Sequence, residues 1–151
     1  MCVGDFLFLK PMLRAQDYSE NIVKQFKYWT VSVHPNQGYL GRCVVWCDRA
    51  DAIDLSEATA AEREELFEIL RQARQAIERA FGAEWINYSF LGNETRHLHG
   101  HIVPRYSGQR EFEGKIFIDR EWGKNWRTDK GVETGLEMLQ SIKKKLQSNW
   151  E

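Results

Sequence analysis

The sequence predicts an α+β protein, in which an antiparallel sheet of about five strands carries one long central helix and a C-terminal helix. Several segments are rich in aromatic and β-branched residues at period two, and turn residues join them as hairpins. One long stretch keeps helical spacing of its apolar residues. With 151 residues, 42% of them hydrophobic, we expect a single domain over residues 1–151 with a substantial core.

Charge and composition exclude several classes of protein. The formal net charge is −1, which argues against strong non-specific binding of nucleic acid. No apolar run approaches the roughly 18–20 residues that span a bilayer, and the N-terminus does not resemble a signal peptide. Three cysteines, at 2, 43 and 47, do not form a disulfide framework. We therefore expect a cytoplasmic protein without a nucleic-acid or membrane partner.

The first elements are expected to be a short helix and a hairpin. Residues 17–26 combine polar and apolar residues in a way that allows a short helix. Residues 28–33 and 39–47 have the composition of strands. Between them, residues 34–38 contain a proline, an asparagine and a glycine, which is turn chemistry.

The central helix has clear start and stop signals. Ser56 or Thr59 can cap it, and Thr59 with Glu62 makes a capping-box pair. Gly82 ends it. Between these signals the apolar residues keep helical spacing: Leu66, Ile69, Leu70, Ala73, Ile77 and Ala80.

The remaining elements alternate strands with turns and finish with a helix. Strands are expected over residues 84–91, about 97–103 and 115–118. Thr128 or Asp129 can cap the C-terminal helix. Its apolar stripe would be formed by Val132, Leu136, Leu139, Ile142 and Leu146.

Three of the four histidines alternate along one predicted strand. Successive strand side chains point to opposite faces, so His97, His99 and His101 share a face, with neighbouring rings about 7 Å apart. Leu98 and Ile102 face the core. Imidazole is both a nucleophile and an acid or base near neutral pH. A row of three therefore allows one ring to attack while its neighbours orient it.

Other interpretations of the histidine row remain open. The strand could be exposed and carry its histidines without a role. His-x-His on a strand also suits zinc, and Cys43 and Cys47 share a face and could contribute if they fold nearby. Buried cysteines more often behave as small apolar residues, which favours a structural role for this pair.

The pattern over residues 97–103 is His-φ-His-φ-His-φ-φ, where φ is an apolar residue or the glycine at 100, and it resembles the histidine triad (HIT) family, in particular its bacterial and archaeal branch. The resemblance covers residues 28–106 as a core, with residues 107–151 as a C-terminal extension that contains a helix. It also extends beyond the triad, to Leu40–Val45, Asn87–Asn93 and Pro104–Tyr106.

This resemblance implies a nucleotide-binding hydrolase or transferase. Its substrates are nucleoside-monophosphate–X compounds, in which X is a polyphosphate nucleotide or an amine, cleaved at the α-phosphate. By position, His99 would be the nucleophile and form a nucleotidyl-histidine, flanked by His97 and His101. The family also implies a homodimer and no required cofactor or metal, although adventitious zinc could bind the histidines.

The same resemblance implies roles for further residues. Asn87 and Asn93 stand where the family places polar groups near the phosphates. Arg42 replaces a common histidine and would supply a permanent charge and a bidentate phosphate contact. His34 stands at the position of a ribose contact, or is only a turn residue. Ala50 replaces another common histidine, so any role there is lost.

Gly100 stands at a slot where relatives place a larger apolar residue, so we expect a neighbouring aromatic ring, Trp46 or Trp85, to fill the space. The rival functions are a zinc-dependent hydrolase or metal-binding protein that uses the same histidines, and a nucleotide-binding protein that has lost turnover.

Overall fold

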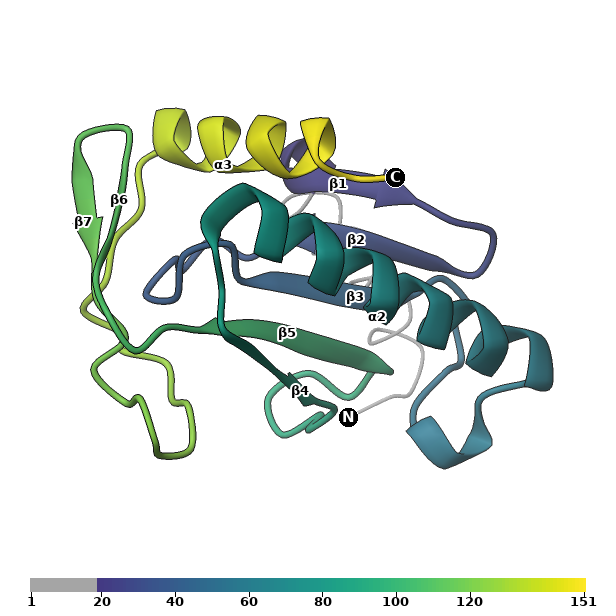
Figure 1. The fold of residues 1–151 in the computed structure, drawn as a ribbon. Coiled ribbons are helices and arrows are strands. Elements are labelled where there is room, and N and C mark those ends of the chain that lie inside the picture. Colours follow the sequence, from purple (N-terminus) through teal and green to yellow (C-terminus); the bar gives the residue numbers. More distant parts are fainter. Residues whose placement is uncertain (1–18) are drawn as a thin grey trace.

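A computed structural model describes residues 19–151. It contains a five-stranded antiparallel sheet in the order β1-β2-β3-β5-β4, a long helix α2 and a C-terminal helix α3 (Figure 1). The α+β class and the five-stranded sheet are confirmed. The sheet strands are β1 (Ile22–Gln25), β2 (Trp29–Val33), β3 (Cys43–Cys47), β4 (Trp85–Ser89) and β5 (His99–Arg105). The other elements are the 3-10 turns η1 (Ser19–Asn21) and η2 (Leu55–Glu57), the helices α2 (Ala60–Phe81) and α3 (Leu136–Ser148), and the strands β6 (Arg110–Phe112) and β7 (Lys115–Phe117).

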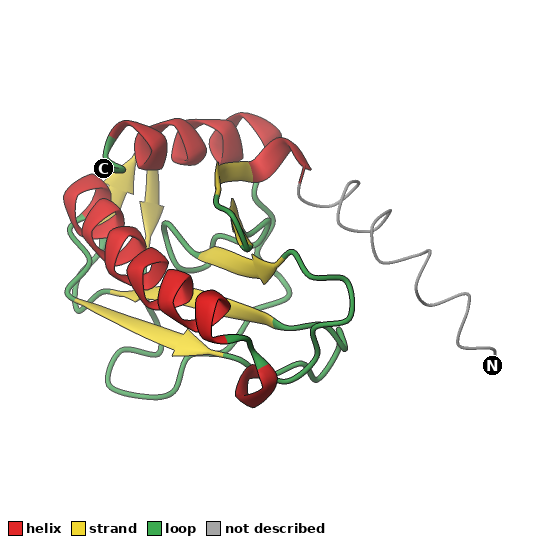
Figure 2. Cartoon of the chain, turned by 90° about the vertical axis from the view of Figure 1, so that its right-hand side faces the viewer, coloured by secondary structure: helices red, strands yellow, loops and turns green. Residues whose placement is uncertain are grey.

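The core lies between the sheet and its helices. Helix α2 crosses one face of the sheet, and α3 runs along the β1–β2 end, as Figures 1 and 2 show from two sides. Trp29, Ile69 and Ile102 are fully buried there. Because strand side chains alternate, this packing leaves the histidines of β5 on the other face.

The predicted capping signals of α2 are confirmed. The hydroxyl of Thr59 accepts from the backbone amide of Glu62, and the Glu62 carboxylate accepts from the amide of Thr59. Gly82 ends the helix in the left-handed conformation, with φ of 69°.

The β2–β3 hairpin is also confirmed, but β3 begins at Cys43 instead of residue 39. Residues 39–42 make a turn in which the amide of Arg42 donates to the carbonyl of Tyr39. Gly41 has φ of 86°, and a Cβ there would lie 2.9 Å from the Phe81 ring. This close approach to α2 requires glycine and bends the chain before the strand starts.

The first predicted helix is wrong within the described residues, which begin at 19. Residues 22–25 form β1 and pair with β2, so backbone pairing with an existing strand outweighs a weak helical pattern. The fifth strand of the sheet is therefore β1. The predicted strand at 115–118 exists as β7, but it pairs with β6 in a separate hairpin.

The C-terminal helix exists but begins later than predicted. It starts at Leu136 after Gly135, because the two predicted caps are used elsewhere. The Thr128 hydroxyl accepts from Arg42, and the Asp129 carboxylate accepts from the amide of Gly131 in a local turn.

Strand β5 starts at His99, two residues later than predicted. Leu98 and Ile102 are buried as expected. An aromatic ring does fill the space at Gly100, but it is Phe90: a Cβ would lie 2.6 Å from two of its ring atoms. Trp46 pairs with His99 and so lies on the histidine face of the sheet, whereas the space at Gly100 is on the core face. Trp85 is 66% exposed on β4, so neither tryptophan fills this space.

Candidate active site

Strand β5 places its histidines in the middle of the sheet. His99 pairs with Trp46 of β3, and His101 lies between Val44 of β3 and Ser89 of β4. The rings of His99 and His101 meet edge to face, with centroids 5.4 Å apart. They are closer than the strand spacing suggests because the side chains converge.

His99 has one nitrogen fixed by the backbone. Its Nδ1 lies 2.6 Å from the carbonyl oxygen of His97. A carbonyl can only accept, so Nδ1 carries the proton. In the neutral ring the lone pair is then on Nε2, the nitrogen away from the backbone, which makes this atom the candidate nucleophile.

His97 supports this arrangement from just before the strand. It is only 4% exposed, and its Nε2 donates to the carbonyl of Cys47 at 2.7 Å. Its ring stacks on Trp46 with centroids 4.4 Å apart, and His99 stacks on the same indole at 5.4 Å. His97 therefore fixes the backbone carbonyl that orients His99.

His101 is held in its neutral form. Burial, with contributions from Arg42 and His99, lowers the pKa of His101 to about 3. A guanidinium nitrogen of Arg42 lies 3.4 Å from Nδ1 of His101. Because guanidinium only donates, Nδ1 accepts, and the proton of His101 is on Nε2. His101 can therefore donate to an anionic oxygen at neutral pH.

His34 lies beside His101 at the end of β2, with ring centroids 5.8 Å apart. Its Nδ1 accepts from the amide of Asn36 at 2.9 Å. Burial, and then the charge of Arg42 and the neighbouring His101, lower the pKa of His34 to about 3. The structure thus brings His34, Arg42 and His101 into one cluster.

The segment between β7 and α3 covers this cluster. The ring of Trp126 lies 5.4 Å from His101, and the Arg42 guanidinium lies 4.9 Å from the same indole. The indole nitrogen of Trp126 donates to the hydroxyl of Ser89, and Arg42 donates to Thr128. Arg42 is 2% exposed and lies against His101, so it is not a surface residue at the sheet edge.

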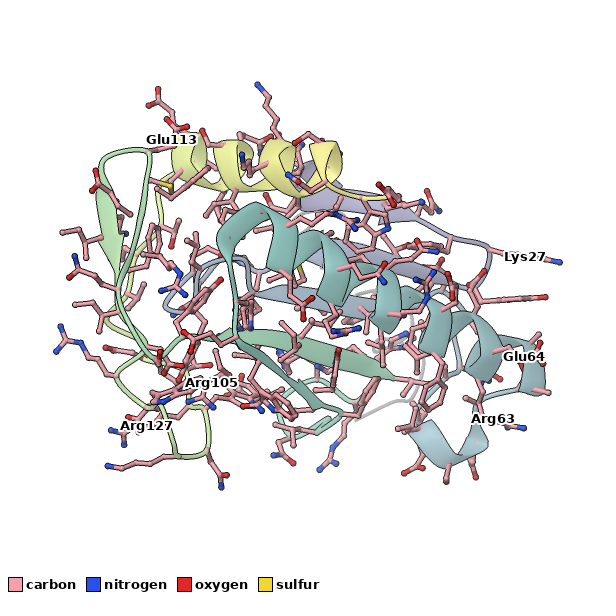
Figure 3. The ribbon with its side chains drawn as sticks, viewed as in Figure 1. Lys27, Arg63, Glu64, Arg105, Glu113 and Arg127 are labelled. Atoms are coloured by element: carbon pink, nitrogen blue, oxygen red, sulfur yellow. The ribbon has the colours of Figure 1, made fainter. Side chains whose placement is uncertain are left out.

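Arg105, at the end of β5, holds that segment in place. Its guanidinium pairs with the buried carboxylate of Asp119 at 2.8 Å and also donates to the carbonyls of Glu121 and Lys124. Figure 3 shows Arg105 where the chain after β7 returns to the sheet, with Arg127 beyond it.

The two predicted asparagines differ in their surroundings. The side-chain oxygen of Asn87 accepts from Arg105 at 2.7 Å, which leaves its amide NH2 as a donor for other groups. Asn87 also lines a cavity of about 600 Å³ with Ser89, Trp126 and Thr128. Asn93 is exposed in the loop after β4. Ala50 is exposed after β3.

Comparison with models of known protein families identifies the family of this chain. The model of the HIT domain matches residues 16–108. The chain belongs to the histidine triad family. The division into a core over 28–106 and an extension over 107–151 remains a prediction.

Solved structures share the fold of this HIT chain. A histidine triad protein from Sinorhizobium meliloti has a TM-score of 0.74 at 20% identity, covering 91% of this chain and 93% of that one. A hypothetical histidine triad nucleotide-binding protein from Sulfolobus tokodaii has a TM-score of 0.70 at 17% identity, covering 96% and 90%. A Zn-bound histidine triad family protein from Mycobacterium smegmatis has a TM-score of 0.62 at 16% identity, covering 93% of each chain. A search of curated proteins found no match.

The cysteines of this HIT chain do not join its histidines. Cys43 and Cys47 are buried free thiols, and burial raises the pKa of Cys43 to about 12. Both alternate onto the core face of β3, away from the histidines. Over residues 19–151, no three histidine, cysteine or acidic side chains lie close enough together to hold a metal ion. In the same range, no helix is long and apolar enough to cross a membrane.

Sequence reasoning missed two aromatic residues of the site. Trp46 alternates with Val44 on β3, so its position on the histidine face followed from strand periodicity. Trp126 had no comparable signal, because it lies in an irregular segment that is held by the long-range contact between Arg105 and Asp119.

Proposed function

We propose that the chain is a nucleotidyl hydrolase or transferase that cleaves nucleoside-monophosphate–X at the α-phosphate, with His99 as nucleophile. The observation that carries the proposal is the hydrogen bond from Nδ1 of His99 to the carbonyl of His97. It directs the lone pair of Nε2 away from the backbone, and His97 is itself anchored to Cys47. This is the arrangement that an imidazole nucleophile requires.

The reaction has two displacements. Nε2 of His99 forms a bond to the α-phosphorus while the bond from phosphorus to X breaks, and X leaves with the bonding electrons and takes up a proton. Water then attacks the same phosphorus, the His99–phosphorus bond breaks, and the nucleoside monophosphate is released as His99 is restored. If another nucleophile replaces water, the reaction is a transfer.

Neighbouring groups support the charge that develops on phosphorus. Arg42 supplies a fixed positive charge next to His101, and the neutral His101 can donate from Nε2 to a phosphate oxygen. The NH2 of Asn87 is a further donor. Asn93 lies in the exposed loop after β4, and a contact between its side chain and a phosphate would be made from that loop. His34 stands next to Arg42, to whose carbonyl its amide donates, and its ring is a candidate contact for a ribose hydroxyl.

Turnover of an adenosine phosphoramidate and of a diadenosine polyphosphate tests this function. The wild-type chain and the His99→Ala variant are assayed with and without a chelator. We expect turnover that resists the chelator and falls by about 10³-fold or more in the variant. Turnover abolished by the chelator would favour the zinc-dependent alternative. Nucleotide binding without any turnover would favour the catalytically silent alternative.

A homodimer is part of the same proposal. Within the described residues β4 ends the sheet, and an edge strand offers unpaired backbone groups. Trp85 and Tyr88 on this strand are 66% and 40% exposed. The two side chains point to opposite faces of the sheet, and pairing of β4 with β4 of a second copy would place a neighbouring strand beside each of them. The absence of a metal requirement and a cytoplasmic location remain predictions.

A further inference from the structure

A second cavity borders the His97–His99 end of the histidine row, whereas Trp126 lies against His101. Leu91 lines both this cavity and the one beside Trp126. Its volume is about 430 Å³, and His97 and His99 form part of its wall. Three apolar side chains line it and are exposed: Ile53 by 53%, Leu55 by 38% and Leu91 by 55%. We call this cavity the apolar pocket.

The apolar pocket contains little charge. Apart from its histidines, the one ionisable side chain among its described lining residues is Asp54, and no lysine or arginine contributes. The carboxylate of Asp54 accepts from the amide of Ser56 at 2.8 Å and from its hydroxyl. Arg96 precedes His97 in the chain but is not among the lining residues. A polyphosphate placed here would meet a carboxylate and apolar carbon instead of cations.

The groups suited to a nucleotide lie at the His101 end of the histidine row. Arg42, His34 and Trp126 gather around His101, where they offer a positive charge, a ring N–H and an aromatic face. A substrate whose α-phosphate lies at His99 has two branches, the nucleoside and X. If the nucleoside extends toward His101, X extends into the apolar pocket.

We propose that the apolar pocket binds the leaving group X, and that X is the apolar part of an amine joined to the α-phosphate in a nucleoside phosphoramidate. This inference rests on the proposed function. As His99 attacks, the phosphorus–nitrogen bond breaks, its electron pair goes to the amine nitrogen, and that nitrogen takes a proton from solvent. The alkyl or aryl group of the amine packs against Ile53, Leu55 and Leu91.

The experiment varies the two branches of the substrate separately. Adenosine phosphoramidates of ammonia, ethylamine, butylamine and hexylamine are compared with a diadenosine polyphosphate, and the guanosine phosphoramidate of hexylamine is compared with the adenosine one. We expect kcat/KM to rise by up to about fourfold for each methylene that is buried. The polyphosphate is expected to be the poorest substrate of the series.

Two variants test whether the dependence of kcat/KM on amine length arises in the apolar pocket. In Ile53→Ser, the ratio of kcat/KM for the hexylamine and ammonia substrates should fall by about tenfold. Ile116→Ser is the matched control, because Ile116 is also 53% exposed but lies on β7, outside the pocket. That variant should keep the wild-type ratio.

Each contrary outcome has a distinct meaning. Turnover that requires His99 but does not depend on the length of the amine, or that favours the polyphosphate, overturns this inference and leaves the proposed function standing. A change in the guanosine-to-adenosine ratio in Ile53→Ser would place the nucleoside in the pocket and also overturn the inference. Failure to turn over any of these substrates would overturn both.

Discussion

At the scale of single residues, the site depends on which nitrogen of each histidine carries the proton. The sequence predicts three rings on one face, but the protonated nitrogen of each ring follows from hydrogen-bond partners that only the fold supplies. Two of those partners are the carbonyl of Cys47, at the end of β3, and the guanidinium of Arg42, the residue just before β3. Strand pairing is thus what makes the rings unequal.

The two histidines with lowered pKa make stability depend on pH. In the unfolded chain His34 and His101 take up a proton near pH 6.5, whereas in the folded chain they do so near pH 3. Between these values the unfolded state binds more protons than the folded state. The contribution of the two histidines to the free energy of unfolding is therefore at its maximum above pH 6.5 and decreases as the pH falls toward 3. Each group contributes a slope of up to about 1.4 kcal/mol per pH unit.

The His34→Asn variant measures this contribution. We expect its slope between pH 4 and 6, followed by urea unfolding, to be smaller than that of the wild type by up to about 1.4 kcal/mol per pH unit. The carboxylates contribute equally to both chains. An unchanged slope would mean that His34 is charged in the folded protein.

Gly100 tests how closely β5 approaches Phe90. In Gly100→Ala the new methyl would lie 2.6 Å from the Phe90 ring, so we expect a loss of about 1–3 kcal/mol in the free energy of unfolding. Adding Phe90→Leu should restore part of it. Gly135→Ala is the control, since a Cβ there meets no atom within 4 Å at φ of −65°. Equal effects of Gly100→Ala and Gly135→Ala would contradict this packing.

At the scale of elements, the sequence predicts the ends of an element correctly where the residues that define those ends contact one another within the same element. The capping box of Thr59 and Glu62 and the stop at Gly82 lie within the helix they define, so the sequence predicts both ends of α2. The predicted start of α3 is wrong because the hydroxyl of Thr128 accepts a hydrogen bond from Arg42 instead of capping a helix. The strand β1 was missed because its stability comes from pairing with β2.

The contact between Arg105 and Asp119 decides how the segment after β7 crosses the site. Both side chains are buried, at 5% and 0% exposure, so removing one leaves an uncompensated charge. We expect Arg105→Met to lower the free energy of unfolding by about 3–5 kcal/mol, measured by urea unfolding. The double variant Arg105→Met, Asp119→Leu should lose less.

The surface pair between Arg127 and Glu121 is the control for that contact. The side chain of Arg127 is 80% exposed, so Arg127→Met should change the free energy of unfolding by about 1 kcal/mol or less. If Arg105→Met were no more damaging than Arg127→Met, the contact would not hold the segment.

At the scale of the whole molecule, the proposed dimer joins two copies along β4. We expect light scattering to give twice the mass of one chain, and Trp85→Glu to shift the protein to monomer by placing a charge at the joined edges. Trp122→Glu, in an exposed loop, is the control and should remain dimeric. A wild-type monomer, or a Trp85→Glu dimer, would contradict pairing along β4.

The molecule as a whole also shows what the sequence could not reveal. Strand alternation and the histidine pattern predict the sheet face that carries the site. They do not predict that Trp126 covers His101, or that Ile53 and Leu55 form a pocket next to His97 and His99. Both arrangements bring together segments separated by tens of residues, and they follow from tertiary contacts instead of local periodicity.

The most direct test of the central role of His99 is to trap the intermediate. The protein is mixed with an adenosine phosphoramidate, the reaction is stopped in alkaline denaturant within milliseconds, and the peptides are mapped by mass spectrometry. We predict an acid-labile adenylyl group on His99 that is absent from the His99→Ala variant. An adenylyl group on another residue, or turnover with no adduct by a chain lacking His99, would contradict the assignment of His99 as nucleophile.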